Sequence, residues 1–121
     1  MKQVSSDVLS TLVVKGMQEK KGLDVTLIDM RNLSNAVADF FVVCSGSSDT
    51  HTSSLADSVE VEVKKESKEM PMAREGKNNG EWVLIDYGNV VVHVFQKESR
   101  EFYSLEALWG DAKITKFEDV E

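Results

Sequence analysis

Two apolar segments separated by only three residues constrain the fold of this chain more than any other feature. The segments are Glu81–Asp86 and Val90–Phe95, and Tyr87, Gly88 and Asn89 lie between them. Val, Ile, Trp and Phe favour β-strands. Gly88 and Asn89 both tolerate the positive φ angles that tight turns often require. The pattern therefore predicts a β-hairpin.

Apolar residues at helical spacing predict two substantial helices elsewhere in the chain. The first begins near Ser5 or Ser6, either of which can cap it, and ends at Gly22. The second follows Ser48 or Asp49 and stops near Met70, because Pro71 disfavours a helical residue before it. A short third helix is expected after the hairpin.

Two further segments have the composition of strands. Val25–Asp29 alternates weakly, and Asp39–Ser45 is apolar almost throughout, which favours burial on both faces. The polar, glycine-bounded stretch Arg74–Gly80 is expected to be a loop. The element order α-β-β-α-β-β-α predicts an α/β fold, in which helices pack on a mixed sheet. We expect one domain over residues 1–121, with a loosely held tail from about residue 113.

Charge and cysteine content narrow the possible partners and location. The chain has 14 Lys and Arg against 21 Asp and Glu, a net charge of −7. This balance argues against direct binding of DNA or RNA, and favours a neutral or basic partner. The single cysteine, Cys44, excludes an internal disulfide and fits a reducing compartment. No segment has the length of a membrane span, and the N-terminus does not resemble a secretory signal. We expect a cytoplasmic location, or an organelle lumen if an upstream targeting segment has been removed.

The loop Gly46–Ser48, between a strand and a helix, is the first candidate for chemistry. Backbone N–H groups at a helix start attract phosphate, but the loop matches no known phosphate-binding motif, and a capping turn is the plainer interpretation. A strand, Gly-Ser and helix also open the nucleotidyltransferase fold. That chemistry needs two carboxylates one residue apart on a nearby strand, to hold a divalent metal. The strand that ends at Asp86 has no second acid in that position, so the metal site is missing from the pattern.

The histidine and cysteine residues provide no clear candidate for a metal site or a reactive group. His51, His93 and Cys44 lie at no recognised metal-ligand spacing, so we expect no metal and no cofactor. Cys44 lies inside an apolar run, where burial keeps a thiol protonated and unreactive. His93 alternates with valines on a strand. It is either a partly exposed strand histidine or a contact residue.

The region from residue 81 to 111 has the composition of an interface. It holds six acidic side chains against two basic ones, together with both Trp and both Tyr residues of the chain. Acids beside large aromatics suit a basic protein partner, although the aromatics could equally form core. In the first hairpin strand, Trp82 and Leu84 point one way while Val83 and Ile85 point the other. Because the helices are expected to cover only one sheet face, we expect an uncovered apolar face that marks an interaction site.

Three stretches of the chain resemble a known family. They are Ala38–Ser48, Glu75-Gly76 with Gly80–Phe95, and Ser99–Ala112. Together they resemble the ribosomal silencing factor family, RsfS, also called Iojap-like. The resemblance implies a nucleotidyltransferase-like α/β fold without the catalytic carboxylates, and therefore no enzymatic activity.

The resemblance also implies a function and a contact region. It implies a translation repressor that binds a large-subunit ribosomal protein, the fourteenth in the standard naming, at the intersubunit face. Binding there would block subunit joining when nutrients are scarce, and the free protein would form homodimers. The alternatives are a nucleotidyltransferase-like enzyme that uses the Gly46-Ser47 loop, and an adaptor for assembly of the large subunit. The partner-binding residues carried over from the family are Trp82, Asp86, Tyr87, Gly88, Asn89, His93, Arg100, Tyr103, Leu105, Glu106 and Trp109.

Two positions depart from the family pattern. Thr50-His51 stand where the family commonly has Arg-Gln, which puts in doubt any role for the start of the second helix. Asn89 stands where the family usually has Asp, which removes one acid from the expected surface.

Overall fold

The computed structural model describes residues 4–34, 36–77, 80–103 and 112–120. Its elements follow one another as α1 (Ser6–Glu19), β1 (Leu23–Asp29), β2 (Phe40–Gly46), α2 (Asp49–Ser67), β3 (Ala73–Lys77), β4 (Trp82–Asp86), β5 (Val90–Gln96), α3 (Lys97–Tyr103) and β6 (Lys113–Lys116). None of the helices in the described part of the chain is long and apolar enough to cross a membrane.

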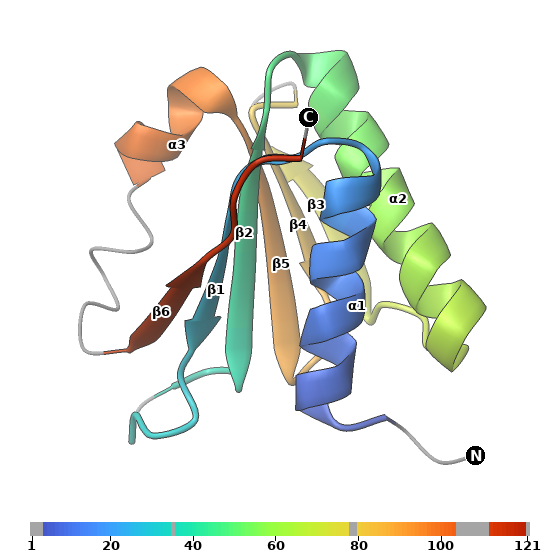
Figure 1. Cartoon of the computed structure of the whole chain (residues 1–121), viewed down its shortest axis with the longest axis vertical. Helices are drawn as coiled ribbons and strands as arrows, with labels where there is room; N and C mark the ends of the chain where they lie inside the picture. Colours follow the sequence, from blue (N-terminus) through green and yellow to red (C-terminus); the bar gives the residue numbers. More distant parts are fainter. Residues whose placement is uncertain (1–3, 35, 78–79, 104–111, 121) are drawn as a thin grey trace.

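The strands form one mixed sheet in the order β3-β4-β5-β2-β1-β6. Strands β2 and β5 are parallel, and the other neighbouring pairs are antiparallel. Helices α1 and α2 lie side by side on one face of this sheet (Figure 1). The predicted α/β fold with a mixed sheet and packed helices is therefore confirmed.

Local capping and a close helix crossing position the two long helices. The side chain of Ser5 accepts a hydrogen bond from Val8 N in α1, and that of Ser48 accepts one from His51 N in α2, so both helix starts lie where the sequence predicted them. The helices cross at Gly16, where a Cβ atom would lie 2.8 Å from Cα of Val59. Only glycine allows the two backbones to approach this closely.

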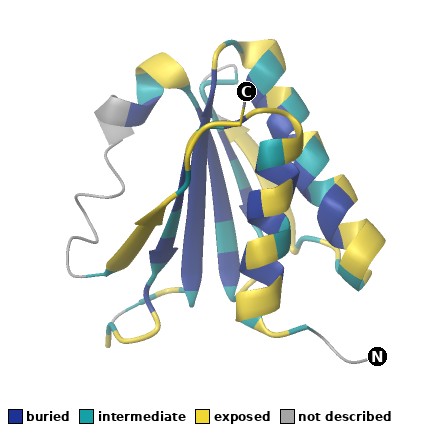
Figure 2. Cartoon of the chain, viewed as in Figure 1, coloured by how far each residue is buried: buried dark blue, intermediate teal, exposed yellow. Residues whose placement is uncertain are grey.

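The helix-covered face holds the larger core cluster. Val83 and Ile85 of β4 point into this core, as the alternation predicted, and Leu9, Met17 and Leu55 from the helices pack there without measurable exposure. Figure 2 shows the central strands as buried, whereas the outer surfaces of both helices and strand β6 are exposed. The interior of the protein thus lies between the helix pair and the sheet.

The two edge strands differ from the sequence prediction. The stretch expected to be a loop contains β3, which pairs with β4 although its residues from Ala73 to Gly76 are exposed and mostly polar. The tail expected to be loosely held contains β6, which pairs with β1, and Phe117 N then donates to the carbonyl oxygen of Val25 at 2.9 Å. The loop expectation was wrong for residues 73–77, because an edge strand is held by backbone hydrogen bonds and requires no apolar alternation. How firmly the tail is held stays a prediction, since β6 is a four-residue edge strand whose side chains are all exposed.

Candidate functional site

Strand pairing places the hairpin residues of the predicted contact region on the sheet face opposite the helices, here called the second face. Trp82, Leu84 and Asp86 of β4 point to this face, because Val83 and Ile85 point to the helix-covered core. Side chains directly across two strands share a face. Trp82 is paired with Phe95, and Leu84 with His93.

The second face is buried at its centre and half-exposed near its β3–β4 edge. Ile28, Phe41, Val43 and Phe95 are all less than 10% exposed. The expectation of an uncovered apolar face is therefore wrong for the centre of the sheet. The expectation holds at the β3–β4 edge, where Trp82 and Leu84 are half-exposed.

Trp82 contacts Phe95 and His93. Its ring stacks on Phe95 with centroids 5.1 Å apart and an angle of 27° between the planes. Its indole Nε1 donates a hydrogen bond to Nδ1 of His93 at 3.1 Å. The indole is thus fastened at one edge and along one face, while part of its surface remains open to solvent.

His93 is buried, contrary to one interpretation of its alternation with valines. It is 3% exposed, and its ring centroid lies 4.8 Å from that of Phe41. Burial lowers the pKa of His93 to about 4, because the charged form loses its hydration. The imidazole is therefore neutral at pH 7. Its burial also rules out extensive direct contact with a partner, so His93 supports the surface rather than forming it.

The hairpin turn forms as predicted, but one of its residues points inward. The carboxylate of Asp86 accepts a hydrogen bond from Gly88 N at 2.7 Å, and Gly88 has φ of +91°. The carbonyl oxygen of Asn89 accepts a hydrogen bond from Asp39 N at 2.8 Å. Tyr87 is only 7% exposed and packs in the helix-covered core, where burial raises the pKa of its hydroxyl. A side chain in this position offers little surface to a partner, and the assignments of Tyr87, Asp86, Gly88 and Asn89 as contact residues stay predictions.

Arg100 has a structural role, and its assignment as a contact residue stays a prediction. It is 9% exposed, and its guanidinium donates to the carbonyl oxygen of Asp24, to Oγ of Ser45 and to Oγ1 of Thr26. These bonds fasten α3 to strands β1 and β2. The sequence does not reveal this role, because the acceptors lie more than 50 positions away in the chain.

The last four residues of the predicted contact region receive no structural test. The backbone of Tyr103 ends α3, but its side chain is outside the described part of the structure, as are Leu105, Glu106 and Trp109 altogether. Their assignment stays a prediction.

The structure adds two residues that the predicted contact region lacked. Leu84 is half-exposed beside Trp82, and Glu75 of β3 lies directly across from Leu84 and is exposed. The alternation along β4 already placed Leu84 with Trp82. No local pattern indicated Glu75, because β3 was not expected to be a strand. We call the surface made by Glu75, Trp82, Leu84 and Asp86 the β3–β4 surface.

The Gly-Ser loop is a packed capping turn, as the plainer interpretation held. A Cβ atom on Gly46 would lie 2.6 Å from Oγ1 of Thr52, so the loop is pressed against the helix that follows. The side chain of Ser48 is occupied by the capping bond from the first turn of α2. Gly46 and the side chain of Ser48 are thus both engaged within the chain.

His51 closes this loop from the side. Its Nδ1 accepts a hydrogen bond from Ser47 N at 2.9 Å, so its Nε2 carries the proton and donates to the carbonyl oxygen of Lys20 at 2.7 Å. The residue that departs from the family pattern therefore has a structural role here, linking the loop to the end of α1.

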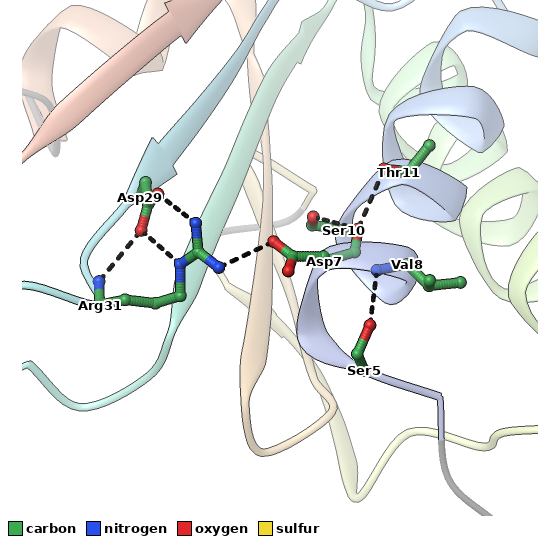
Figure 3. A network of polar contacts seen from close by, with 7 residues as sticks. All are labelled: Ser5, Asp7, Val8, Ser10, Thr11, Asp29 and Arg31. Atoms are coloured by element: carbon green, nitrogen blue, oxygen red, sulfur yellow. Dashed lines mark hydrogen bonds and ion pairs between the residues drawn. The ribbon is translucent and has the colours of Figure 1, made fainter.

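An arginine network joins the start of α1 to the end of β1. Arg31 bonds both oxygens of Asp29 and one oxygen of Asp7 (Figure 3). Its guanidinium lies 4.8 Å from the ring centre of Phe40. The same hydrogen bonds lower the pKa of the Asp29 carboxyl. The charges of Arg31 are thus satisfied within the chain. An open cleft of about 390 Å³ lies beside it, between the β1–β2 connection and the hairpin turn at Gly88.

The remaining candidates for chemistry are also structural. Cys44 is buried, and burial raises the pKa of its thiol to about 12, so it stays protonated as predicted. Within the described ranges, no three His, Cys, Asp or Glu side chains gather in a way that could hold a metal ion.

Comparison with known proteins places this architecture in one family. Residues 3–121 match the family described as "Ribosomal silencing factor during starvation". The "Ribosomal silencing factor RsfS" of Halalkalibacterium halodurans is 38% identical over 117 residues, which cover 97% of this chain and 98% of that protein. A crystal structure of a protein from Chromobacterium violaceum has a TM-score of 0.81 at 34% identity and covers 88% of each chain.

A more distant relative carries a different description. The mouse protein "Mitochondrial assembly of ribosomal large subunit protein 1" is 30% identical over 101 residues, which cover 81% of this chain and 43% of that protein. The sequence match extends over nearly the whole chain, and the fold is shared. We conclude that this chain belongs to the ribosomal silencing factor family.

Proposed function

We propose that this protein represses translation by binding the large ribosomal subunit and excluding the small one. In this proposal the β3–β4 surface contacts a basic protein of the large subunit, the fourteenth, on the side that meets the small subunit. The mechanism is steric and involves no catalysis. Membership of the silencing factor family supports the ribosome as the target. The location that fits the proposal is the cytoplasm.

The β3–β4 surface is the observation that carries the proposal. It presents the half-exposed Trp82 and Leu84, with the exposed Glu75 across from Leu84 and the half-exposed Asp86 next to Leu84 on the same face of β4. Lys77 is the cross-strand partner of Trp82. Interfaces are often anchored by large aromatic side chains that fill a pocket of the partner, with charged groups at the rim. Because Trp82 is already fastened to Phe95 and His93, binding costs little additional side-chain entropy.

The condition of the Gly46–Ser48 loop supports a role without catalysis. The enzyme alternative requires this loop to hold a nucleotide phosphate. Instead, Ser47 N is bonded to His51, and Gly46 is packed against Thr52. Calorimetry with ATP, CTP and magnesium tests this point. We expect no binding, and tight binding would support the enzyme.

The direct test is a subunit-joining assay with matched variants. Light scattering follows joining after magnesium is added to separated subunits, in the presence of the protein. The wild type should keep the subunits apart. Trp82→Ala should weaken binding by about 2 kcal/mol or more, because an anchor is lost. Val61→Ala, at an exposed apolar residue on α2, is the control and should act like the wild type. Normal joining by ribosomes that carry bound protein would overturn the proposal.

A second candidate function is assistance in assembling the large subunit. The description of the mouse relative as a mitochondrial protein for assembly of the ribosomal large subunit favours it. Sedimentation of ribosomes from cells that lack the protein separates the two functions. A silencer should leave mature free subunits, whereas an assembly factor should leave immature particles.

The homodimer implied by the family resemblance belongs to the same proposal. The exposed backbone of β3 at the sheet edge supports it, because such an edge can pair with another strand. Size-exclusion chromatography with light scattering tests it, and a monomer at all concentrations would reject the dimer.

A further inference from the structure

His93 and Trp82 form a diagonal pair across β4 and β5. Strand register pairs Leu84 with His93 and Trp82 with Phe95, so Trp82 lies one pair along from His93 on the same face. Diagonal neighbours on a sheet face are within reach of aromatic side chains. Their ring centroids are 5.7 Å apart. One member of the pair is half-exposed and the other is buried.

The hydrogen bond between the two side chains can run in only one direction, from Trp82 to His93. The indole N–H of Trp82 donates and cannot accept, so Nδ1 of His93 must be the acceptor. The neutral imidazole then carries its proton on Nε2. A protonated imidazole would turn an N–H toward another N–H and break the contact. The bond therefore exists only while His93 is neutral.

The surroundings of His93 keep it neutral. Phe41 and Phe95 lie on either side, and Val43 is its partner on β2. Strand pairing places the charged residues Glu75 and Lys77 of β3, Asp86 of β4 and Lys116 of β6 on the same face, and the α3 contacts add Arg100; the side chain of Lys77 is outside the described part of the structure. None of these groups shifts the pKa of His93. Burial alone lowers the pKa of His93, to about 4. Among the described residues, Nε2 has no hydrogen-bond partner.

We propose that His93 is a positioning residue, whose Nδ1 orients the Trp82 indole for contact with the large-subunit protein. The identity of the partner in this inference rests on the proposed function. The geometry of the Trp82–His93 pair does not depend on it. Without the acceptor, the indole loses the contact that fixes its edge, so it can shift along Phe95 and the orientation that fits the partner becomes one of several. Binding must then select it, at a cost in entropy.

Three substitutions at His93 separate the acceptor from the packing. His93→Phe keeps a ring among the aromatics but removes the acceptor. His93→Asn places an amide oxygen close to the position of Nδ1, and His93→Gln places it nearer that of Nε2. We expect His93→Phe and His93→Gln to bind the large subunit about 3- to 10-fold more weakly, the value of one hydrogen bond. His93→Asn should recover most of the affinity. Equal binding by the Asn and Gln variants would overturn the proposal, even if His93→Phe fails to fold.

A spectroscopic readout tests the geometry without the ribosome. The indole N–H signal of Trp82 in a nitrogen–proton correlation spectrum is assigned by comparison with Trp109→Phe, since the chain has two Trp residues. We expect this signal to lie downfield and to exchange slowly in the wild type. It should move upfield in His93→Gln and remain in place in His93→Asn.

The two readouts distinguish the two possible failures. If the indole signal behaves as expected but the wild type does not bind the large subunit, the proposed function is wrong and the partner must be sought elsewhere. If the wild type binds and the signal is unchanged in His93→Gln, the positioning role is wrong and the proposed function stands.

Discussion

Arg100 donates a hydrogen bond to the main-chain carbonyl oxygen of Asp24 at 2.6 Å, across 76 positions of sequence. Asp24 has φ of +55° and lies where the register of β1 shifts against β2. Few residues other than glycine, Asn and Asp adopt this conformation. The buried guanidinium thus stabilises an irregular point of the sheet and fixes α3 beside it.

The first prediction concerns this contact. Arg100→Ala should lower the free energy of unfolding by about 2–4 kcal/mol, because it removes the donor to the buried hydroxyl groups of Thr26 and Ser45 and one of the donors to the carbonyl oxygen of Asp24. Urea denaturation measures the loss. Lys97→Ala, an exposed change in the same helix, is the control and should cost little. A stable Arg100→Ala protein that fails to bind the ribosome would support Arg100 as a contact residue.

The second prediction compares two glycines. Gly16→Ala should destabilise the fold by about 1–3 kcal/mol, because the new Cβ meets the backbone of Val59 and forces the helices apart. Gly76→Ala introduces a Cβ that meets nothing within 4 Å on the exposed edge strand β3. It should leave stability unchanged or raise it slightly. Thermal melts of both variants test the helix crossing, and similar melting temperatures would contradict it.

The third prediction is a loss of stability in mild acid. The pKa of His93 is about 4 in the folded protein and 6.5 in the unfolded chain, so the unfolded chain binds the proton first as pH falls. Stability contributed by neutral His93 is complete above pH 6.5 and is lost as pH falls toward 4, by at most about 3 kcal/mol. Urea denaturation across this range measures it.

His93→Asn provides the control for the acid prediction, because the other titrating groups remain. The carboxyl groups of Asp29 and Glu62, whose pKa values are lowered by Arg31 and Lys15, lose stability only at lower pH. The difference between wild type and variant isolates the histidine. Identical pH profiles would show that His93 is hydrated in solution.

The fourth prediction uses charge on the β3–β4 surface. Glu75→Lys should slow association with the large subunit and weaken the dependence of the association rate on salt, because a basic partner is attracted less strongly. Glu66→Lys, on the exposed side of α2, carries the same charge change and should alter both much less. Stopped-flow measurements at several salt concentrations compare them. Equal effects of the two variants would show that the net charge of the protein sets the association rate, and that the position of Glu75 on the β3–β4 surface does not matter.

Local patterns were sufficient for the central elements. Helical spacing with serine caps located α1 and α2, and the turn residues Gly88 and Asn89 located the hairpin. These features depend on residues a few positions apart, so the sequence carries them directly. The alternation along β4 also divided Trp82 and Leu84 from Val83 and Ile85, as the structure has them.

The contact region was only partly predictable, because local patterns do not reveal contacts between distant segments. Alternation tells which side chains share a sheet face, but not what packs against that face. Tyr87, His93 and Arg100 were all expected at the surface, and each is less than 10% exposed. Their burial depends on distant segments: Tyr87 packs in the core formed with the helices, and Arg100 bonds to β1 and β2.

The sequence by itself determined the helices, the central strands and the turn, because propensity, periodicity and capping act over short separations. The tertiary structure alone decided that polar segments became the edge strands β3 and β6, that Glu75 joined Leu84 on one surface, and that a buried histidine supports an exposed tryptophan. Each of these depends on backbone hydrogen bonds or burial between residues that no local pattern connects. Such contacts become defined only when the sheet is assembled.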